Sequence, residues 1–189
     1  MKQIHNLLNY QNLKIIQDSE LFQFSLDSVL LANFVTLNQK TKKILDIGTG
    51  NAPIPLILSK KTKAQITGIE IQEKSYTLAK ESVEYNHLQN QINIIFKDVK
   101  EYYKEEESDQ FDCIVCNPPF FRLKTTSRIN DKEEKTIARH EKTLTLEEIF
   151  QISKKLLKNN GRIAIVHRVE RLIDIICIMK QNNIEPKKV

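Results

Sequence analysis

Lys43-Ile44-Leu45-Asp46-Ile47-Gly48-Thr49-Gly50 predicts the fold of this chain more clearly than any other segment. Its first five residues are a largely apolar run, typical of a buried strand in a parallel sheet. The two glycines that follow allow a tight turn and let the backbone approach a ligand closely. Proline at position 53 is tolerated only in the opening turn of a helix. The segment therefore predicts a strand, a turn and a helix at an edge where open α/β sheets bind their ligands.

Strands and helices alternate from about residue 43 onward, which predicts an α/β fold with a mostly parallel, twisted sheet and helices on both faces. The expected strands are 43–47, 64–71, 92–97, 111–116 and 162–167. The expected helices are 53–60, 73–86, 145–158 and 169–181, and the polar segment 101–110 is expected to be a short helix or a surface loop.

Two of these helices carry signals of their own. Thr145 and Glu148 form a capping box, and Gly161 is expected to end the helix that the box begins. The last helix is expected to be amphipathic, with four apolar residues at helical spacing. They are Leu172, Ile173, Ile176 and Met179.

Residues 1–40 follow a different pattern. Leu13–Ile16 and Leu21–Phe24 flank four polar residues, which predicts a small hairpin. Leu26–Leu37 then reads as an apolar helix, with Ser25 or Asp27 as its N-cap. We expect one domain, residues 1–189, in which this hairpin and helix precede a Rossmann-like core at 43–189.

The bulk composition permits a nucleic-acid partner. The formal net charge is +5, and Lys and Arg neutralise phosphates when a protein binds RNA or DNA. No apolar stretch has the length of a membrane span, and the N-terminus lacks the apolar core of a signal peptide, so we expect a cytoplasmic protein with no membrane partner. Cys113 and Cys116 point to opposite faces of a strand, so we expect small core residues and no metal site.

Two carboxylates end neighbouring strands of the predicted sheet. Glu70 lies about twenty residues beyond the glycines, where an acid can accept hydrogen bonds from both ribose hydroxyls of a nucleoside. Asp98 ends the next strand and could accept from an adenine amino group. Each acid alone could instead be a loop cap or a solvated charge. Ala52 interrupts the glycine pattern of dinucleotide enzymes, and no lysine stands at the spacing of a P-loop.

Asn117-Pro118-Pro119-Phe120 follows the fourth strand, and two consecutive prolines must end that strand. An exocyclic amine such as adenine N6 is a poor nucleophile because its lone pair is delocalised into the ring. The Asn117 side-chain oxygen and the Pro118 carbonyl could accept both amine hydrogens and draw the nitrogen toward a reactive geometry. Phe120 could stack on the base, which must leave its helix or loop to be reached. The alternative is a structural turn, since Asn and Pro are common turn residues.

Together these features resemble the Rossmann-like, S-adenosylmethionine-dependent methyltransferases that act on amino groups. More narrowly, the chain resembles the bacterial tRNA(Val) adenine N6-methyltransferase family, which modifies the adenine beside the anticodon. The matching segments are 24–32, 45–50, 117–121, 138–141 and 166–172. The resemblance implies an enzyme that methylates adenine N6 in tRNA with S-adenosylmethionine as cofactor.

The resemblance also implies roles for single residues. Gly48 and Gly50 would face the methionine part of the cofactor. Glu70 would bind the ribose, Ile71 would pack on the adenine and Asp98 would bind the adenine amine. The implied cofactor-binding set is Asp27, Asp46, Gly48, Gly50, Glu70, Ile71, Asp98 and Asn117.

The implied catalytic residues are Asn117, Pro118 and Phe120. Asp27 could close over the cofactor or serve as a plain N-cap. The polar segment 121–143 follows the catalytic turn, and we expect it to meet RNA phosphates beside a splayed-out base through Arg122, Lys124 and Arg128. A solvated loop is the alternative.

Other readings stay open at this stage. Family members continue past residue 189 with a strand hairpin, so we expect that hairpin to be missing and the fifth strand to be an exposed sheet edge. The same motif serves N5-methylation of glutamine in proteins and methylation of adenine in DNA or ribosomal RNA. A cofactor- or RNA-binding module without turnover is a further alternative, and the sequence leaves the oligomeric state undecided.

Overall fold

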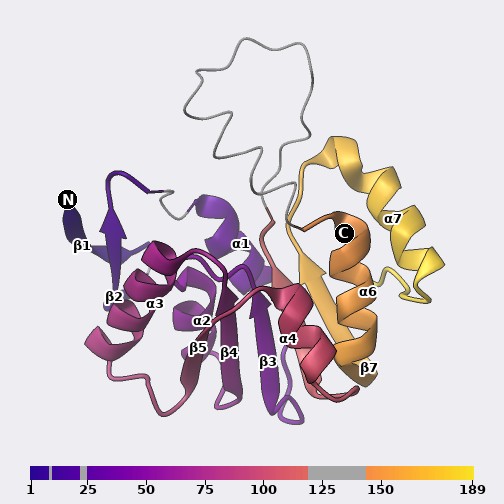
Figure 1. The fold of residues 1–189 in the computed structure, drawn as a ribbon, viewed down its shortest axis with the longest axis horizontal. Helices are drawn as coiled ribbons and strands as arrows, with labels where there is room; N and C mark the ends of the chain where they lie inside the picture. Colours follow the sequence, from indigo (N-terminus) through magenta and orange to yellow (C-terminus); the bar gives the residue numbers. More distant parts are fainter. Residues whose placement is uncertain (9, 22–24, 119–143) are drawn as a thin grey trace. The chain divides into compact units, whose positions relative to one another are not determined.

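The computed structural model describes residues 1–8, 10–21, 25–118 and 144–189. Its strands are β1 (Lys2–Leu7), β2 (Tyr10–Asp18), β3 (Lys43–Ile47), β4 (Gln65–Glu70), β5 (Ile92–Phe96), β6 (Phe111–Cys116) and β7 (Leu157–Ile165). Its helices are α1 (Leu26–Phe34), α2 (Pro53–Ser59), α3 (Glu73–Tyr85), α4 (Val99–Glu105), α6 (Leu146–Leu156), the 3-10 turn η1 (Val169–Arg171) and α7 (Leu172–Gln181). Figure 1 shows their arrangement along the chain.

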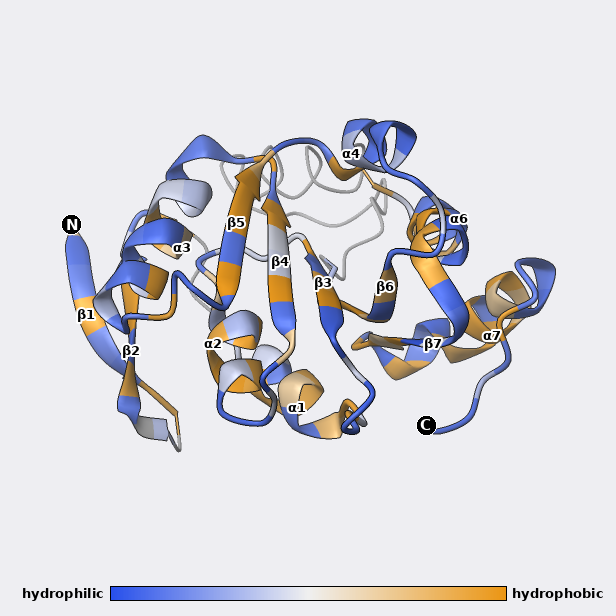
Figure 2. Cartoon of the chain, turned by 90° about the horizontal axis from the view of Figure 1, so that it is seen from below, coloured by the Kyte–Doolittle hydropathy of each residue, from blue (hydrophilic) through white to orange (hydrophobic). Residues whose placement is uncertain are grey.

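The five strands β5-β4-β3-β6-β7 form one sheet, and every pairing in it is parallel. The parallel α/β sheet predicted from the sequence is therefore confirmed. β3 lies at its centre, and Ile44, Leu45 and Ile47 in that strand are fully buried or nearly so. Figure 2 shows α1 and α2 on one face of this sheet and α4 on the other, with apolar residues along the central strands. All parallel strands point their carboxyl ends to the same edge, which collects the residues that follow β3, β4, β5 and β6.

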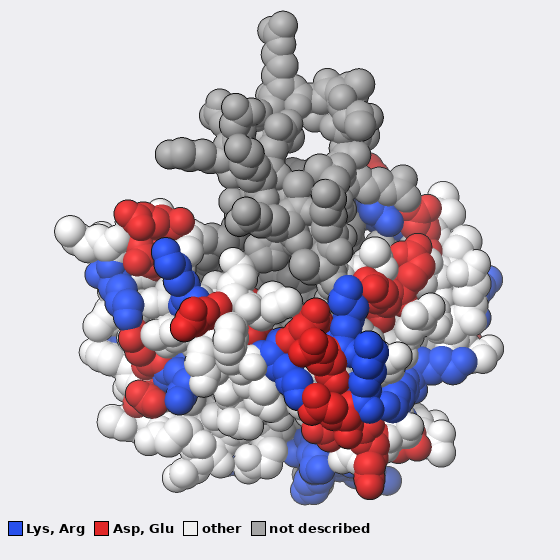
Figure 3. Space-filling view, viewed as in Figure 1, with Lys and Arg blue, Asp and Glu red and all other residues white. Residues whose placement is uncertain are grey.

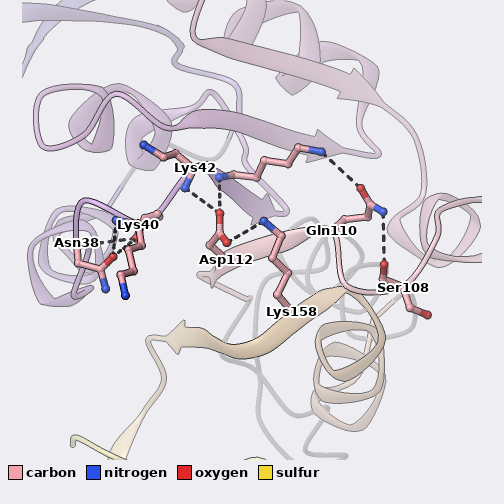
Figure 4. Close-up of polar contacts among 9 residues, drawn as sticks. Asn38, Lys40, Lys42, Ser108, Gln110, Asp112 and Lys158 are labelled. Carbon is pink, nitrogen blue, oxygen red and sulfur yellow. Dashed lines mark hydrogen bonds and ion pairs between the residues drawn. The ribbon is translucent and has the colours of Figure 1, made fainter.

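Asp112 fixes the opposite edge of the sheet, as Figure 4 shows. Its carboxylate accepts hydrogen bonds from the backbone N–H groups of Lys42 and Lys43, at 2.8 Å each, and from Lys158 Nζ at 2.8 Å. Partial burial opposes ionisation, but these hydrogen bonds outweigh it and hold the pKa of Asp112 below its ordinary value. One side chain thus ties the starts of β3 and β7 to β6.

The N-terminal hairpin differs from the prediction in its bounds and in one of its strands, whereas residues 13–16 lie in a strand as predicted. It consists of β1 and β2, which pair from Lys2 with Asp18 to Leu7 with Tyr10, whereas Leu21 lies outside any strand. β1 escapes a search for alternating apolar residues because five of its six residues are exposed. Residues 22–24 of the expected second strand lie outside the described residues.

Side chains of α3 hold β2 in place. Asn86 accepts from the Lys14 N–H (2.9 Å) and donates to the Lys14 carbonyl (2.6 Å). The Ile16 N–H donates to Ser82 Oγ at 3.0 Å. Asn51 Nδ2 donates to the Ile16 carbonyl at 3.0 Å, which connects the hairpin to the turn after β3.

The C-terminal elements differ from the prediction in two places. The capping box is confirmed, since Glu148 Oε2 accepts from the Thr145 N–H and Thr145 Oγ1 accepts from the Glu148 N–H. Gly161 does not end the helix: α6 ends at Leu156, β7 begins at Leu157, and Gly161 lies within β7 beside Asn160, which has φ +63°. The last helix begins at Leu172 after a 3-10 turn, and its buried residues are Ile175 and Ile178 instead of the predicted stripe.

Two compact units make up the chain. The first holds residues 1–117 and 156–166, with both sheets and α1 to α4, and the second holds 118–155 and 167–189. The single domain expected from the sequence stays a prediction. Among the described residues, we find no helix with the length and apolarity needed to cross a membrane.

Candidate functional site

The turn after β3 is built from residues with unusual backbone angles. Gly48 and Gly50 have φ of +70° and +58°, the left-handed region that glycine occupies without strain. The Thr49 N–H donates to the Ile69 carbonyl of β4 at 2.9 Å, which fixes the turn against the sheet. A Cβ added at Gly48 or Gly50 would find no atom of the described residues within 4 Å. The two glycines therefore border open space, as expected of a surface that receives a ligand.

Beneath this turn lies a buried carboxyl group. Asp46 is fully buried; its Oδ2 accepts from Thr49 Oγ1 at 2.6 Å, and its Oδ1 has no hydrogen-bond partner among the described residues. Burial raises the pKa of Asp46 to about 7, the Glu70 carboxylate adds to the rise and the Thr49 hydroxyl opposes it. The lack of a side chain at Gly68 leaves room for Thr49, because a Cβ at position 68 would lie 2.9 Å from Thr49 Oγ1.

Glu70 closes the turn from the neighbouring strand. Ile47 and Ile69 are register partners, so Glu70 lies level with Gly48. The Glu70 carboxylate is 4% exposed and accepts from the Gly50 N–H (2.9 Å) and the Gln72 N–H (2.8 Å). Each carboxylate oxygen retains a lone pair for a ribose hydroxyl. Ile71 follows with 42% of its surface exposed, which leaves its side chain available to pack on a planar ring.

Asp98 lies at the end of the next strand and caps α4. Its Oδ1 accepts from the Lys100 N–H at 2.8 Å, so the cap considered as an alternative from the sequence is present. No described residue donates to its other oxygen, so the predicted contact with an adenine amine stays a prediction.

Asn117 completes the row of residues at this edge. Ile47 and Cys116 are register partners in adjacent strands, so Gly48 and Asn117 leave the sheet side by side. Asn117 Nδ2 donates to Ser28 Oγ of α1 at 2.9 Å. No described residue donates to Asn117 Oδ1. The carboxamide oxygen is therefore available to a further donor, and Pro118 follows it directly.

The remaining predicted residues are less informative. Asp27 Oδ2 accepts from Ser25 Oγ at 3.2 Å, and Ser25 occupies the N-cap position of α1 without a capping bond from its side chain. Phe120, Arg122, Lys124 and Arg128 lie outside the described residues.

Reasoning from the sequence missed four residues of this site: Ser28, Thr49, Asn51 and Gly68. Gly68 carried a signal, because a glycine inside a strand indicates close approach of another chain segment. Ser28 lies in the matching segment 24–32, but no role could be read for it because its partner Asn117 lies 89 residues away in the sequence.

The family model described as "Methyltransferase small domain" matches residues 24–181, which include every residue of this site. The chain belongs to the methyltransferase small domain family.

Relatives of this methyltransferase carry a more specific name. A protein of Flavobacterium psychrophilum named "tRNA1(Val) (adenine(37)-N6)-methyltransferase" is 28% identical over 97% of this chain and 77% of its own. A protein of Trichodesmium erythraeum with the same name is 30% identical over 88% of this chain and 69% of its own. The narrower resemblance noted in the sequence is thereby confirmed.

The solved structure of a SAM-dependent methyltransferase from Agrobacterium tumefaciens matches with a TM-score of 0.69 over 97% of this chain and 58% of that chain, at 16% identity. At that identity the likeness supports the fold, and the Rossmann-like methyltransferase fold predicted from the sequence is confirmed.

Both cysteines of β6 behave as core residues of this methyltransferase. Cys113 and Cys116 are buried and free. Burial raises the pKa of the Cys113 thiol to about 12 and that of Cys116 further. Neither thiol is therefore a nucleophile at neutral pH.

Proposed function

We propose that this chain transfers a methyl group from S-adenosylmethionine to N6 of an adenine in RNA. The observation that carries the proposal is the position of Asn117. It leaves β6 beside the glycine turn of β3, with its carboxamide nitrogen held by Ser28 and its oxygen free of donors from the described residues. A weakly nucleophilic amine needs a hydrogen-bond acceptor close to the bound cofactor, and Asn117 Oδ1 lies beside the turn that we assign to the cofactor.

The residues at the carboxyl edge of the sheet fit the cofactor. Gly48 and Gly50 border open space, and the buried Asp46 has an oxygen without a partner. We assign the methionine part to this turn, the ribose to Glu70 and the adenine to Ile71 and Asp98. Asp27 lies in the first turn of α1, which also carries Ser28, and we assign it a supporting role at the same site.

S-adenosylmethionine supplies an electrophilic methyl group on a positively charged sulfur. Asn117 Oδ1 and the Pro118 carbonyl accept the two hydrogens of the adenine amine, which localises the nitrogen lone pair for attack. Phe120 stacks on the base and holds it out of its loop. After transfer the methylated amine loses its extra proton to water, so no side chain has to act as a base.

We further propose that the RNA is tRNA(Val) and that the target is the adenine beside the anticodon. The printed names of the relatives support this choice. Arg122, Lys124 and Arg128 follow the catalytic turn in the sequence and are the cations that we assign to phosphates beside the target base. With a tRNA substrate, we infer a cytoplasmic enzyme.

The surface around α4 is unsuited to the RNA backbone. Figure 3 shows acidic side chains interleaved with basic ones over this helix. Residues 97–110 contain six acidic side chains against three lysines, and one of those lysines, Lys97, pairs with Glu105. Phosphates would be repelled there, which favours an approach from the segment that carries the three cations.

Labelled S-adenosylmethionine and two tRNA(Val) transcripts test the proposal. One transcript keeps the adenine beside the anticodon, and the other has guanine in its place. We expect label in N6-methyladenosine from the first transcript and none from the second. Equal labelling of both would refute the assigned position, and label in protein or in no acceptor at all would refute the RNA reaction.

The Asn117→Ala variant tests the catalytic assignment. Without the acceptor we expect turnover to fall by about a thousandfold, while the dissociation constant of S-adenosylmethionine, measured by calorimetry, stays within about twofold. Turnover near the wild-type rate would mean that another group activates the amine.

A further inference from the structure

We propose that Ser28 is a positioning residue for methyl transfer: its hydroxyl holds the Asn117 carboxamide in the orientation that presents the oxygen, and not the NH2 group, to the target amine. This inference rests on the function proposed above. It concerns a residue of α1 that neither the motifs nor the names of the relatives assign.

The orientation matters because a carboxamide has two ends of nearly equal shape and opposite hydrogen-bonding character. A half-turn about the last side-chain bond exchanges the oxygen acceptor for an NH2 donor. The target amine donates through its two hydrogens. An Asn117 NH2 group facing it would also be a donor, so no hydrogen bond could form between them. Only one of the two orientations of Asn117 can therefore support the reaction.

In the structure Asn117 adopts the productive orientation, with its amide nitrogen on Ser28. Asn117 Nδ2 lies 2.9 Å from Ser28 Oγ, and no described residue contacts Oδ1. A serine hydroxyl can accept from an amide nitrogen or donate to an amide oxygen, and the structure has the amide nitrogen at Ser28 Oγ. In this arrangement Ser28 accepts from the Asn117 amide, which leaves Oδ1 as the exposed end.

Ser28 is placed for this task by the register of α1. Its neighbours Leu26 and Leu30 are more than half exposed, whereas Ser28 is 4% exposed and lies on the buried face with Val29. A polar side chain at such a position costs free energy unless it is hydrogen-bonded. Ser59 in α2 meets this requirement within its own helix, because its Oγ donates to the Leu56 carbonyl at 2.7 Å. Ser28 instead accepts from a side chain that follows β6.

Three variants separate a positioning role from a structural one. Ser28→Ala removes the acceptor, Ser28→Thr keeps a hydroxyl, and Ser59→Ala removes a buried helical hydroxyl away from Asn117. We expect Ser28→Ala to lower kcat by about tenfold, the effect of losing one hydrogen bond, while KM for tRNA and the dissociation constant of S-adenosylmethionine stay within about twofold. Ser28→Thr should restore most of the lost kcat, and Ser59→Ala should leave kcat unchanged.

A second readout needs no turnover. The side-chain NH2 signals of Asn117 in a ¹⁵N–¹H correlation spectrum can be assigned by their disappearance in Asn117→Ala. Ser28→Ala should shift these signals and speed their exchange with water, and Ser59→Ala should not. The inference would be overturned if Ser28→Ala kept the wild-type kcat, or if it left the shifts and exchange rates of the Asn117 NH2 signals unchanged. A wild-type chain that methylates no RNA would instead overturn the proposed function, and the amide signals alone would then decide whether Ser28 holds Asn117.

Discussion

At the scale of single residues, the turn after β3 places Ala52 in the same left-handed backbone region as its glycines. Ala52 has φ +69° and is fully buried, whereas Gly48 has φ +70° and open space around the position of a Cβ. A change at Ala52 should therefore affect backbone strain, and with it stability, but not the space assigned to the cofactor. A side chain at Gly48 would also occupy space that we assign to the cofactor.

These differences predict the outcome of two substitutions. Gly48→Ala should lower the free energy of unfolding by only about 1 kcal/mol, because the backbone strain is the sole cost within the protein. It should weaken S-adenosylmethionine binding by more than about tenfold, which corresponds to about 1.4 kcal/mol. Ala52→Gly is the control, with a change in stability below about 1 kcal/mol and unchanged binding. Denaturant unfolding and calorimetry measure both quantities, and equal losses of stability and affinity in Gly48→Ala would contradict the assignment.

Asp46 predicts a specific dependence of stability on pH. Burial, aided by the Glu70 carboxylate and opposed by the Thr49 hydroxyl, raises its pKa from 3.8 to about 7. Between these values the unfolded chain binds fewer protons than the folded chain, so the free energy of unfolding falls as the pH rises and levels off above about 7.

Asp46→Asn cannot ionise and should lack this dependence. Relative to the variant, the wild type should lose up to about 4 kcal/mol of stability between pH 4 and pH 7, because each unit of pKa shift corresponds to about 1.36 kcal/mol. Denaturant unfolding at several pH values measures the difference. Parallel profiles for the two proteins would mean that Asp46 titrates at its ordinary pKa in the folded state.

The sequence predicted the position of those site residues that lie at or just after the end of a strand. Glu70, Asp98 and Asn117 lie at the carboxyl edge of the sheet as expected, because a parallel sheet brings such ends together whatever the loops do. What each side chain contacts could not be predicted. The capping bond of Asp98 and the contact between Asn117 and Ser28 depend on the packing of helices against the sheet, which local patterns do not encode.

At the scale of elements, the N-terminal hairpin depends on α3 for its position. Asn86 satisfies both the N–H and the carbonyl of Lys14, and it also donates to the Ser82 carbonyl of its own helix. These contacts replace the strand that β2 lacks on that side. The sequence predicted a hairpin here, and residues 13–16 lie in β2 as expected. The partner strand was predicted wrongly, because the exposed β1 shows no apolar alternation.

Asn86→Ala should therefore loosen the hairpin without disturbing the central sheet. Leaving the partly buried backbone groups of Lys14 without partners should cost about 2 kcal/mol. Native-state hydrogen exchange should show faster exchange of the Lys14 amide, with little change at β3 and β6. Asn90→Ala, an exposed change beyond the same helix, is the control. Uniformly faster exchange across all strands would show that the hairpin and the sheet unfold as one unit.

At the scale of the whole molecule, the parallel sheet was predictable because several independent patterns agree on it. Apolar runs of strand length alternate with helical segments, and glycine, acid and asparagine follow successive strands. The junction of α6 and β7 was not predictable, because no residues separate the two elements and Asn160, not Gly161, adopts the left-handed conformation.

The distribution of charge over the chain leads to a prediction for RNA binding. Substituting Gln for Arg122, Lys124 and Arg128 lowers the formal net charge of +5 by three, and so does substituting Gln for Lys97, Lys100 and Lys104 near α4. If the first triple contacts phosphates, its loss should reduce the slope of log affinity against log salt by about 2, because each phosphate contact contributes about 0.7 in single-stranded RNA. The second triple lies in segment 97–110 with six acidic residues and should change the slope little. Filter binding of tRNA from low to moderate salt measures both slopes. Equal reductions would mean that net charge, and not the segment after the catalytic turn, determines RNA affinity.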